Sequence, residues 1–163
     1  MKETHSKPTP QETLGTLLRG SGKKISVAES CTGGMISHLI TTVPGSSEYY
    51  LGSVTSYAAE IKVKLLGVNP GSIEKNGIVS SAVAAEMAEG VRKLTGSTYS
   101  VATTGWADSS GDEHEEAGTA WIGIAGPSGT ITRRIRSHRS RVANIRRFSR
   151  SALEILSDYI LKG

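Results

Sequence analysis

The sequence predicts an α/β protein in which helices cover both faces of a mixed sheet, that is, a three-layer α/β/α sandwich. Two patterns lead to this prediction. Extended and helical segments alternate through the first part of the chain, whereas two extended segments near the carboxyl end follow one another as a hairpin. Strands joined through helices run parallel and hairpin strands run antiparallel, so a sheet with both kinds needs helices on both faces.

No internal repeat and no interdomain linker interrupt the chain of 163 residues. We therefore expect a flexible segment over residues 1–8 and a single domain over residues 9–163. A chain of this length can bury a core. Small aliphatic side chains must supply most of it, because aromatic residues make up only 5% of the sequence.

The first helix begins at a clear start signal. Thr9 is placed as the cap, Pro10 takes the first helical position, and Glu12 can complete a capping box. A leucine-rich buried face follows, and Gly20 ends the helix. Residues 24–28 then alternate apolar and small polar side chains, which predicts a strand.

The segment after residues 33–34 predicts a helix with one buried face, because its apolar residues recur every three or four positions. A turn at residues 44–47 leads to an extended stretch over residues 49–58. A short helix over residues 60–66 follows, and residues 69–71 (Asn-Pro-Gly) break it.

An alanine-rich pattern predicts a longer helix over residues 82–94, with Ser80 or Ser81 as its cap. Residues 99–104 then read as a central strand.

The carboxyl-terminal part holds a hairpin and a helix. Strands are predicted over residues 118–125 and 130–136, and the final helix spans residues 140–161. The side chains expected on the buried face of this helix are Val142, Ile145, Phe148, Leu153, Leu156 and Ile160.

One turn carries most of the functional information. Ser30 lies in residues 29–34 (ESCTGG), between the first predicted strand and a helix. Such a turn exposes a hydroxyl beside backbone N–H groups that have no partner inside the helix. This is the arrangement of an acyl-transfer nucleophile next to an oxyanion site. An ordinary turn with Ser30 or Thr32 as a helix cap fits these residues equally well.

Composition limits the class of protein. The sequence is 37% hydrophobic and 21% charged and contains 19 glycines, as is typical of a soluble globular protein with many tight turns. No apolar run approaches the roughly 20 residues that cross a bilayer. Residues 1–8 offer no apolar stretch for a secretion signal, so we expect a cytoplasmic location and no membrane partner. Cys31 is the only cysteine, so no internal disulfide forms, which agrees with a reducing compartment.

The formal net charge of +4 is unevenly distributed. Acidic residues crowd residues 108–116, and the arginines that crowd the next stretch are Arg133, Arg134, Arg136, Arg139, Arg141, Arg146, Arg147 and Arg150. A basic cluster can hold nucleic acid phosphates, but no stacking aromatics are interleaved here as single-strand binders require. We therefore do not expect nucleic acid as a partner and favour a solvated helix face or a subunit contact.

Several of these arginines lie in or just before the first turns of the last helix, where the helix dipole disfavours cations by up to about 1 kcal/mol. Something must offset that cost. The acidic segment 112–116 is the best candidate within the chain, and a ligand phosphate or a second subunit are the others. We expect a homo-oligomer, with a dimer as the favoured state, and we expect Arg141 to contact the phosphate of a substrate.

Further motifs follow the serine turn in a fixed order. They are Tyr57-x-x-Glu60-x-Lys62-x-x-Leu65-Leu66-Gly67-Val68, Gly77-Ile78-Val79-Ser80, Glu86-Met87-Ala88-Glu89-Gly90, Thr104-Gly105 and Gly118-Thr119-Ala120-Trp121-Ile122-Gly123. In this order and spacing the sequence resembles the C-terminal domain of the competence/damage-inducible CinA family over about residues 10–160. Stand-alone members of that family are nicotinamide-nucleotide amidases, and we expect this chain to be such a free-standing form.

The resemblance implies a domain of the CinA C-terminal type that hydrolyses the carboxamide of nicotinamide mononucleotide to nicotinate mononucleotide and ammonia, without a cofactor. It implies Ser30 as the nucleophile, with Lys62 and Tyr57 assisting it. We expect the substrate, a small nucleotide, to contact the serine turn and the loop after the central strand. The residues in question are Cys31, Thr32, Gly33, Gly34, Thr104 and Gly105.

The chemistry is consistent with these roles. A serine hydroxyl is a poor nucleophile until a base takes its proton, and no histidine of this chain lies in a persuasive motif, so lysine is the available base. Lys62 would need its pKa lowered by about three units, a differential of roughly 4 kcal/mol. The Tyr57 hydroxyl is placed to bond Ser30 or Lys62 and steer the proton. A surface lysine and a strand tyrosine packed on the sheet are the plain alternatives.

Cys31 is the rival nucleophile, because a thiol at a helix start can have a lowered pKa. We rank it below Ser30. A lone cysteine more commonly serves as a small buried side chain.

The loop after the central strand departs from the family pattern. Where the family usually carries Thr-Gly-Ile-Ala-Gly-Pro followed by glycines, this chain reads TGWADSSGD at residues 104–112. Asp108 adds negative charge where a ligand phosphate would lie, Trp106 adds bulk, and Ala59 replaces a common asparagine. Two alternatives follow: a family member with a changed substrate, or a non-catalytic nucleotide-binding or regulatory module.

A metal site is the other interpretation of this loop. Asp108, Asp112 and His114 carry ligand-type side chains, but their spacing fits neither a calcium loop nor a zinc motif. We therefore expect no metal.

Overall fold

A five-stranded sheet with the strand order β2-β1-β3-β4-β5 forms the centre of the molecule. In the computed structural model, which describes residues 6–163, β1 (Ile25–Glu29) lies between β2 (Tyr50–Thr55) and β3 (Tyr99–Trp106) and runs parallel to both. β4 (Thr119–Gly126) and β5 (Gly129–Arg136) continue the sheet as antiparallel strands. The sheet is therefore mixed, as predicted. Of the segment expected to be flexible, residues 1–5 lie outside the described residues.

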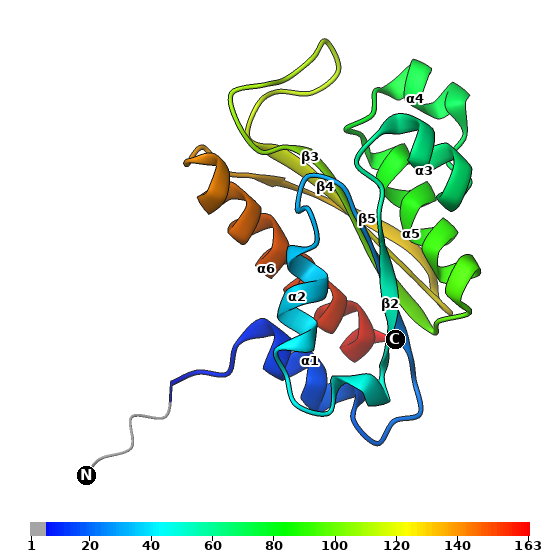
Figure 1. Cartoon of the computed structure of the whole chain (residues 1–163), viewed down its shortest axis with the longest axis vertical. Coiled ribbons are helices and arrows are strands. Elements are labelled where there is room, and N and C mark those ends of the chain that lie inside the picture. Colours follow the sequence, from blue (N-terminus) through cyan, green and yellow to red (C-terminus); the bar gives the residue numbers. More distant parts are fainter. Residues whose placement is uncertain (1–5) are drawn as a thin grey trace.

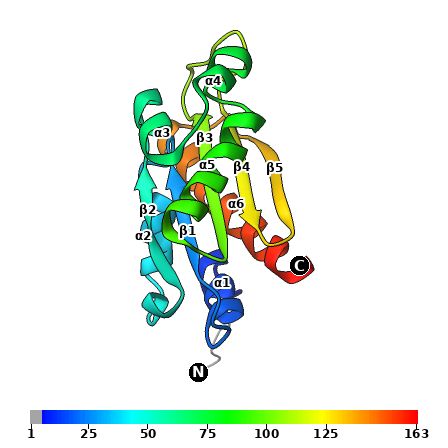
Figure 2. The same ribbon diagram turned by 90° about the vertical axis from the view of Figure 1, so that its right-hand side faces the viewer.

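Helices cover both faces of this sheet (Figure 1). One face carries α1 (Pro10–Leu18), α2 (Met35–Thr41) and α6 (Arg141–Lys162). The other carries α3 (Ala59–Leu66), α4 (Pro70–Asn76) and α5 (Ser81–Thr95), with α5 lying across the middle strands (Figure 2). A short 3₁₀ helix, η1 (Ser46–Glu48), precedes β2. This arrangement confirms the predicted three-layer α/β/α sandwich.

The core forms on both faces because side chains alternate along the central strands. Val27 and Val101 belong to the cluster under α1, α2 and α6. Their neighbours Ala28 and Ala102 belong to the cluster under α5. All four side chains are fully buried, which explains why the inner strands contain apolar and small residues on both faces.

Two glycines set how closely the α5 layer packs. A Cβ atom at Gly123 of β4 would lie 2.3 Å from the carbonyl oxygen of Ala84, so α5 rests directly on the sheet. A Cβ atom at Gly90 would lie 1.9 Å from the carbonyl oxygen of Leu66, the last residue of α3. α3 can therefore pack this closely on α5 only because residue 90 is a glycine, which has no Cβ atom.

Most predicted elements are present, with local differences. The first helix has the expected capping box between Thr9 and Glu12. α4 was not predicted, because residues 69–71 read only as a break; Asn69 instead accepts a hydrogen bond from the Gly71 N–H and starts a helix. Val142 was wrongly placed on the buried face of the last helix, since it is 55% exposed in the first turn of α6.

None of the helices within residues 6–163 combines the length and the apolar character needed to cross a bilayer.

Candidate active site

Glu29, the last residue of β1, shapes the turn that follows it. Its side chain is fully buried, and its carboxylate accepts hydrogen bonds from the Thr32 hydroxyl (2.7 Å) and from the N–H groups of Ile36 (2.9 Å) and Ser37 (3.0 Å). A carboxylate at the amino end of α2 also matches the helix dipole. The sequence analysis gave Glu29 no role, although an acidic residue that ends a buried strand just before a helix start is a usable signal.

The same turn needs two glycines. Gly33 and Gly34 have φ angles of 60° and 103°, in the left-handed region that costs other residues energy. α2 therefore begins at Met35, the first residue of the apolar pattern. The turn brings Ser30, which is only 8% exposed, to the carboxyl end of β1.

Lys62 lies directly beside Ser30. Its Nζ atom is 2.8 Å from the Ser30 Oγ atom. Lys62 belongs to α3, which follows β2, and β2 is a parallel neighbour of β1. Because the carboxyl ends of parallel strands meet at one edge of the sheet, the start of α3 and the serine turn become neighbours. The structure thus joins the predicted nucleophile and the predicted base.

Two backbone carbonyls fix the Lys62 side chain. Its Nζ atom, on a fully buried residue, donates to the carbonyl oxygens of Ser56 (2.5 Å) and Tyr57 (3.2 Å). These two bonds use two of the three positions on the nitrogen, and the third faces Ser30. In its neutral form, the amine can keep both N–H bonds and offer its lone pair to the Ser30 hydroxyl.

Burial lowers the pKa of Lys62 from 10.5 to about 8. Among residues 6–163, no carboxylate forms an ion pair with this lysine. A pKa near 8 leaves roughly one tenth of the side chains neutral at pH 7. The direction agrees with what a lysine base requires.

Burial affects the pKa values of Cys31 and Lys62 in opposite directions, because it disfavours the charged form of each. Burial raises the pKa of its thiol to about 12, and its side chain packs with Ala107, Ala120 and Phe148. A thiol with that pKa remains protonated near neutral pH, and the thiolate is the nucleophilic form. Burial of the thiol therefore argues against Cys31 as the nucleophile.

Tyr57 contacts the lysine through its backbone and not through its ring. Its side chain is 61% exposed, and its hydroxyl accepts a hydrogen bond from Nη2 of Arg141 at 3.0 Å. The expected bond from the phenol to Ser30 or Lys62 is not made. The sequence could not distinguish these options, because the side chain and the carbonyl of one residue point in different directions.

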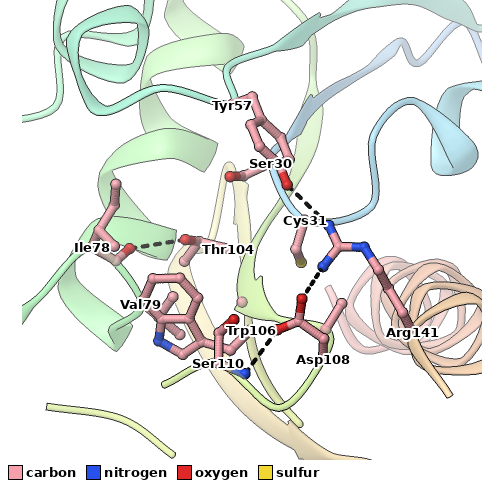
Figure 3. Close-up of a pocket in the computed structure, with 12 residues that line it drawn as sticks. Ser30, Cys31, Tyr57, Ile78, Val79, Thr104, Trp106, Asp108, Ser110 and Arg141 are labelled. Atoms are coloured by element: carbon pink, nitrogen blue, oxygen red, sulfur yellow. Dashed lines mark hydrogen bonds and ion pairs between the residues drawn. The ribbon is translucent and has the colours of Figure 1, made fainter. Parts of the chain in front are cut away.

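A cavity of about 230 Å³ opens in front of Ser30 (Figure 3). Its lining comes from the serine turn, the β2–α3 connection, the segment before α5, the end of β3 with its following loop, and the start of α6. The residues are Ser30, Cys31, Tyr57, Ile78, Val79, Thr104, Gly105, Trp106, Ala107, Asp108, Ser110 and Arg141.

Not every predicted contact residue reaches this cavity. Thr32, Gly33 and Gly34 do not line it, and the Thr32 hydroxyl is engaged by Glu29. Gly105 does line it, but its glycine character is explained by β4, because a Cβ atom there would lie 2.7 Å from the carbonyl oxygen of Thr119. Thr32, Gly33 and Gly34 therefore shape the backbone of the turn and do not line the cavity.

Arg141 forms an ion pair across the cavity wall with Asp108, with Nη1 and Oδ2 2.7 Å apart. The acidic segment 112–116, expected to offset the arginines of the last helix, contacts β5 instead. Glu115 accepts hydrogen bonds from Arg134, and Glu116 lies 2.8 Å from Arg136. The reason is positional, because the beginning of the loop, at Asp108, approaches α6, whereas its later part contacts β5.

Asn144 connects the two segments that carry Asp108 and Arg141. It is buried, and its Nδ2 atom donates to the carbonyl oxygens of Ala107 (2.7 Å) and Arg139 (3.1 Å). Its Oδ1 atom accepts from the Arg139 N–H at 3.0 Å. One side chain thus joins the residue before Asp108 to the start of the helix that carries Arg141. Sequence reasoning missed this residue, because a polar side chain on a helix gives no signal of its partner.

Within residues 6–163, no group of three histidine, cysteine, aspartate or glutamate side chains is arranged to hold a metal ion. Asp112 instead accepts hydrogen bonds from the N–H groups of His114 and Glu115, and so caps a turn.

Comparison with known proteins places this site in a family. The model of the CinA C-terminal domain matches residues 8–160. The chain belongs to the CinA C-terminal domain family. A CinA-like protein of Desulfosudis oleivorans is 46% identical over 150 residues, which is 91% of this chain and 36% of the relative. A CinA-like protein of Salinibacter ruber is 45% identical over 147 residues, 90% of this chain and 36% of the relative. The chain thus spans about a third of the length of these curated relatives.

Solved CinA-family structures have the same fold. A CinA superfamily protein from Klebsiella pneumoniae superposes with a TM-score of 0.90 at 25% identity, over 94% of this chain and 97% of that one. A competence/damage inducible protein from Agrobacterium tumefaciens gives a TM-score of 0.85 at 27% identity, over 92% of this chain and 94% of that one. The Ser30–Lys62 pair therefore sits on a CinA-type scaffold.

Proposed function

We propose that this CinA-family chain is an amidohydrolase that converts the carboxamide of nicotinamide mononucleotide to a carboxylate and releases ammonia. The observation that carries the proposal is the 2.8 Å contact between the Lys62 amine and the Ser30 hydroxyl at the wall of a cavity. A hydroxyl paired with a buried amine is the arrangement that Ser-Lys hydrolases use.

The proposed reaction proceeds in two halves. Neutral Lys62 takes the proton of Ser30 while the Ser30 oxygen bonds to the carboxamide carbon. The carbon–nitrogen bond then breaks, and the nitrogen leaves as ammonia with the proton that Lys62 returns. Water, deprotonated by the same amine, attacks the resulting ester, and Ser30 regains its hydrogen. Every proton transfer thus passes through one nitrogen atom.

Backbone amides of the turn support the charge that develops on the substrate oxygen. The N–H of Gly33 bonds to the Ser30 carbonyl, and the amides of Ile36 and Ser37 bond to Glu29, so these three are occupied. Among the described residues, the amides of Cys31 and Thr32 donate to no acceptor of another residue. Of the two, Cys31 adjoins Ser30 and lines the cavity, so its amide is the candidate oxyanion donor.

Ammonia release from nicotinamide mononucleotide tests the proposal. We expect Ser30→Ala to lower kcat/KM by at least about a thousandfold, the scale seen when a nucleophile is removed. The matched control is Ser47→Ala, which removes an exposed hydroxyl in η1. Release of ammonia by Ser30→Ala at the rate of the parent would refute the assignment. A Cys31→Ala variant that is as impaired as Ser30→Ala would point to the thiol.

A second candidate is a nucleotide-binding or regulatory module that binds without turnover. The changed loop after β3 favours it, because Trp106 and Asp108 alter the ligand side of the cavity. Titration calorimetry with nicotinamide mononucleotide, run beside the ammonia assay, separates the two. Heat of binding without ammonia release supports the module, and ammonia release supports the enzyme.

A further inference from the structure

The charge balance of the cavity wall has a consequence for the substrate. Asp108 and Arg141 are the charged residues among those that line the cavity. Both ends of the Arg141 guanidinium are engaged by the chain itself, Nη1 by Asp108 at 2.7 Å and Nη2 by the Tyr57 hydroxyl at 3.0 Å. The wall therefore presents a neutralised pair and not a free cation.

The carboxylate is held in place from its other side. Its second oxygen, Oδ1, accepts a hydrogen bond from the Ser110 N–H at 2.8 Å. These contacts, with the Ser110 hydrogen bonds as the largest cause, keep the pKa of Asp108 below its usual range, so its negative charge persists at neutral pH. Asn144 holds the neighbouring residue, Ala107, against the start of α6. Hydrogen bonds from Ser110 and Asn144 thus hold the backbone segments that carry Asp108 and Arg141.

A phosphate group that enters this cavity meets an unfavourable arrangement. To form a bidentate bond that uses Nη1 of Arg141, it must displace Asp108, and at Nη2 it competes with the Tyr57 hydroxyl. The displaced carboxylate, tied to Ser110, remains beside the phosphate as a like charge. The gain from the arginine is offset by the loss of the existing pair and by repulsion.

The remaining wall suits an uncharged ligand. Ile78, Val79 and Trp106 supply apolar and aromatic surface, and Trp106 lies across the cavity from Ser30 (Figure 3). The cavity of about 230 Å³ is also below the range of about 300–1,000 Å³ usual for ligand pockets. A small ligand with a planar carboxamide ring fits these surfaces better than a ligand with a dianionic tail.

We propose that Asp108 is a specificity-determining residue that cancels the charge of Arg141, so that the site accepts carboxamide nucleosides without a phosphate about as well as their monophosphates. This inference rests on the proposed amidohydrolase function. It names the substrate class of that site: the ring and its carboxamide carry recognition, and the phosphate contributes little.

The test compares nicotinamide mononucleotide with its phosphate-free nucleoside. For the full chain, we expect kcat/KM for ammonia release to favour the mononucleotide by less than about threefold. Asp108→Asn keeps the size of the side chain and an acceptor for the Ser110 N–H but removes the charge. Because Arg141 then becomes free for phosphate, and charge-assisted hydrogen bonds are stronger than neutral ones, we expect the preference to rise about tenfold. The rise should come mainly from a lower KM for the mononucleotide.

The matched control is Glu113→Gln, which removes one negative charge from the same loop at an exposed side chain outside the cavity lining. A rise in preference of more than about threefold over this control supports the inference, and a smaller change overturns it. Asp108→Ser, which retains an acceptor for Ser110, replaces Asp108→Asn if that variant does not fold.

The two proposals fail in different ways. If neither compound yields ammonia with any variant, the amidohydrolase function is wrong. The substrate inference is then judged on Ser30→Ala and its Asp108→Asn double variant by titration calorimetry, where the same threefold criterion applies to the ratio of the two Kd values.

Discussion

Lys62 meets the conditions that a lysine base needs, and each condition comes from a different contact. Full burial disfavours its charged form, two carbonyls orient it, and Ser30 occupies the remaining position. The sequence indicated the identity of both partners and the need for a lowered pKa. It did not indicate that Tyr57 would act through its carbonyl or that Glu29 would hold the turn, because both contacts depend on how separate segments meet in space.

We expect the activity to rise with pH through about 8. In the proposed mechanism the neutral amine of Lys62 is the active form, and its pKa of about 8 means that the neutral fraction grows as the pH rises. Below this value, kcat/KM should increase about tenfold per pH unit, and above it a plateau should follow. The measurement is the pH profile of ammonia release. A profile that is flat from pH 6 to 9 would exclude Lys62 as the titrating base.

The same residue lowers stability in a pH-dependent manner. The pKa of Lys62 is about 8 in the folded chain and 10.5 for an ordinary, exposed lysine as in the unfolded chain. Between these pH values the unfolded chain binds one more proton than the folded chain, so the free energy of unfolding rises with pH. Below pH 8, the full cost of burying the ammonium applies. Lys62→Met lacks this titration, so its stability relative to the parent should fall by roughly 3 kcal/mol between pH 8 and 10.5.

Denaturant unfolding at several pH values measures this difference. Lys64→Met is the control, because the Lys64 side chain lies exposed on the same helix. Equal pH dependence of the two variants would show that burial of Lys62 does not set its proton affinity.

At the scale of elements, the sequence identified periodic and long segments better than short ones. The strands and the long helices α5 and α6 were predicted within a few residues, because their apolar patterns repeat several times. α4 was missed, since Asn-Pro-Gly serves equally as a turn and as a capped helix start. The pairing of α6 with the loop after β3 was assigned to the wrong acidic residues, because charge patterns specify sign but not partner.

Asn144→Ala should disturb the junction between α6 and that loop. The substitution leaves the Ala107 carbonyl and the Arg139 N–H without their partner in a buried place, at a cost of about 1–3 kcal/mol. We expect a lower free energy of unfolding and a larger KM, because Asp108 and Arg141 lose their common support. Arg147→Ala, an exposed change on the same helix, should stay within about 0.5 kcal/mol of the parent. Equal stability of the two variants would contradict this role of Asn144.

At the scale of the whole molecule, only some of the clustered arginines form ion pairs within the described part of the chain. Arg134, Arg136 and Arg141 find acidic partners within the chain. In the described part of the chain, Arg139, Arg146 and Arg147 form no ion pair and are exposed near the start of α6. The helix dipole disfavours cations at this end, so carboxylates from outside the chain would be favourable there.

A homo-oligomer, with a dimer favoured, therefore remains our prediction. Sedimentation velocity over a range of protein and salt concentrations measures it, and we expect the larger species to weaken as salt rises, because exposed charge pairs are screened. Arg146→Glu combined with Arg147→Glu should lower the association further. A single monomeric species under all conditions would contradict the prediction.

The reactive pair and the charged wall of the site come from separate stretches of the chain. Ser30 follows β1, and Lys62 lies 32 positions later in α3. Trp106, Asp108 and Arg141 come from the end of β3, the loop after it and the start of α6. Reactivity and selectivity are thus inherited through different segments. Mutations can accumulate in the second stretch without touching the first, so the substrate range of such a domain can drift while its chemistry stays constant. A combinatorial library confined to residues 106–110 would explore that drift directly.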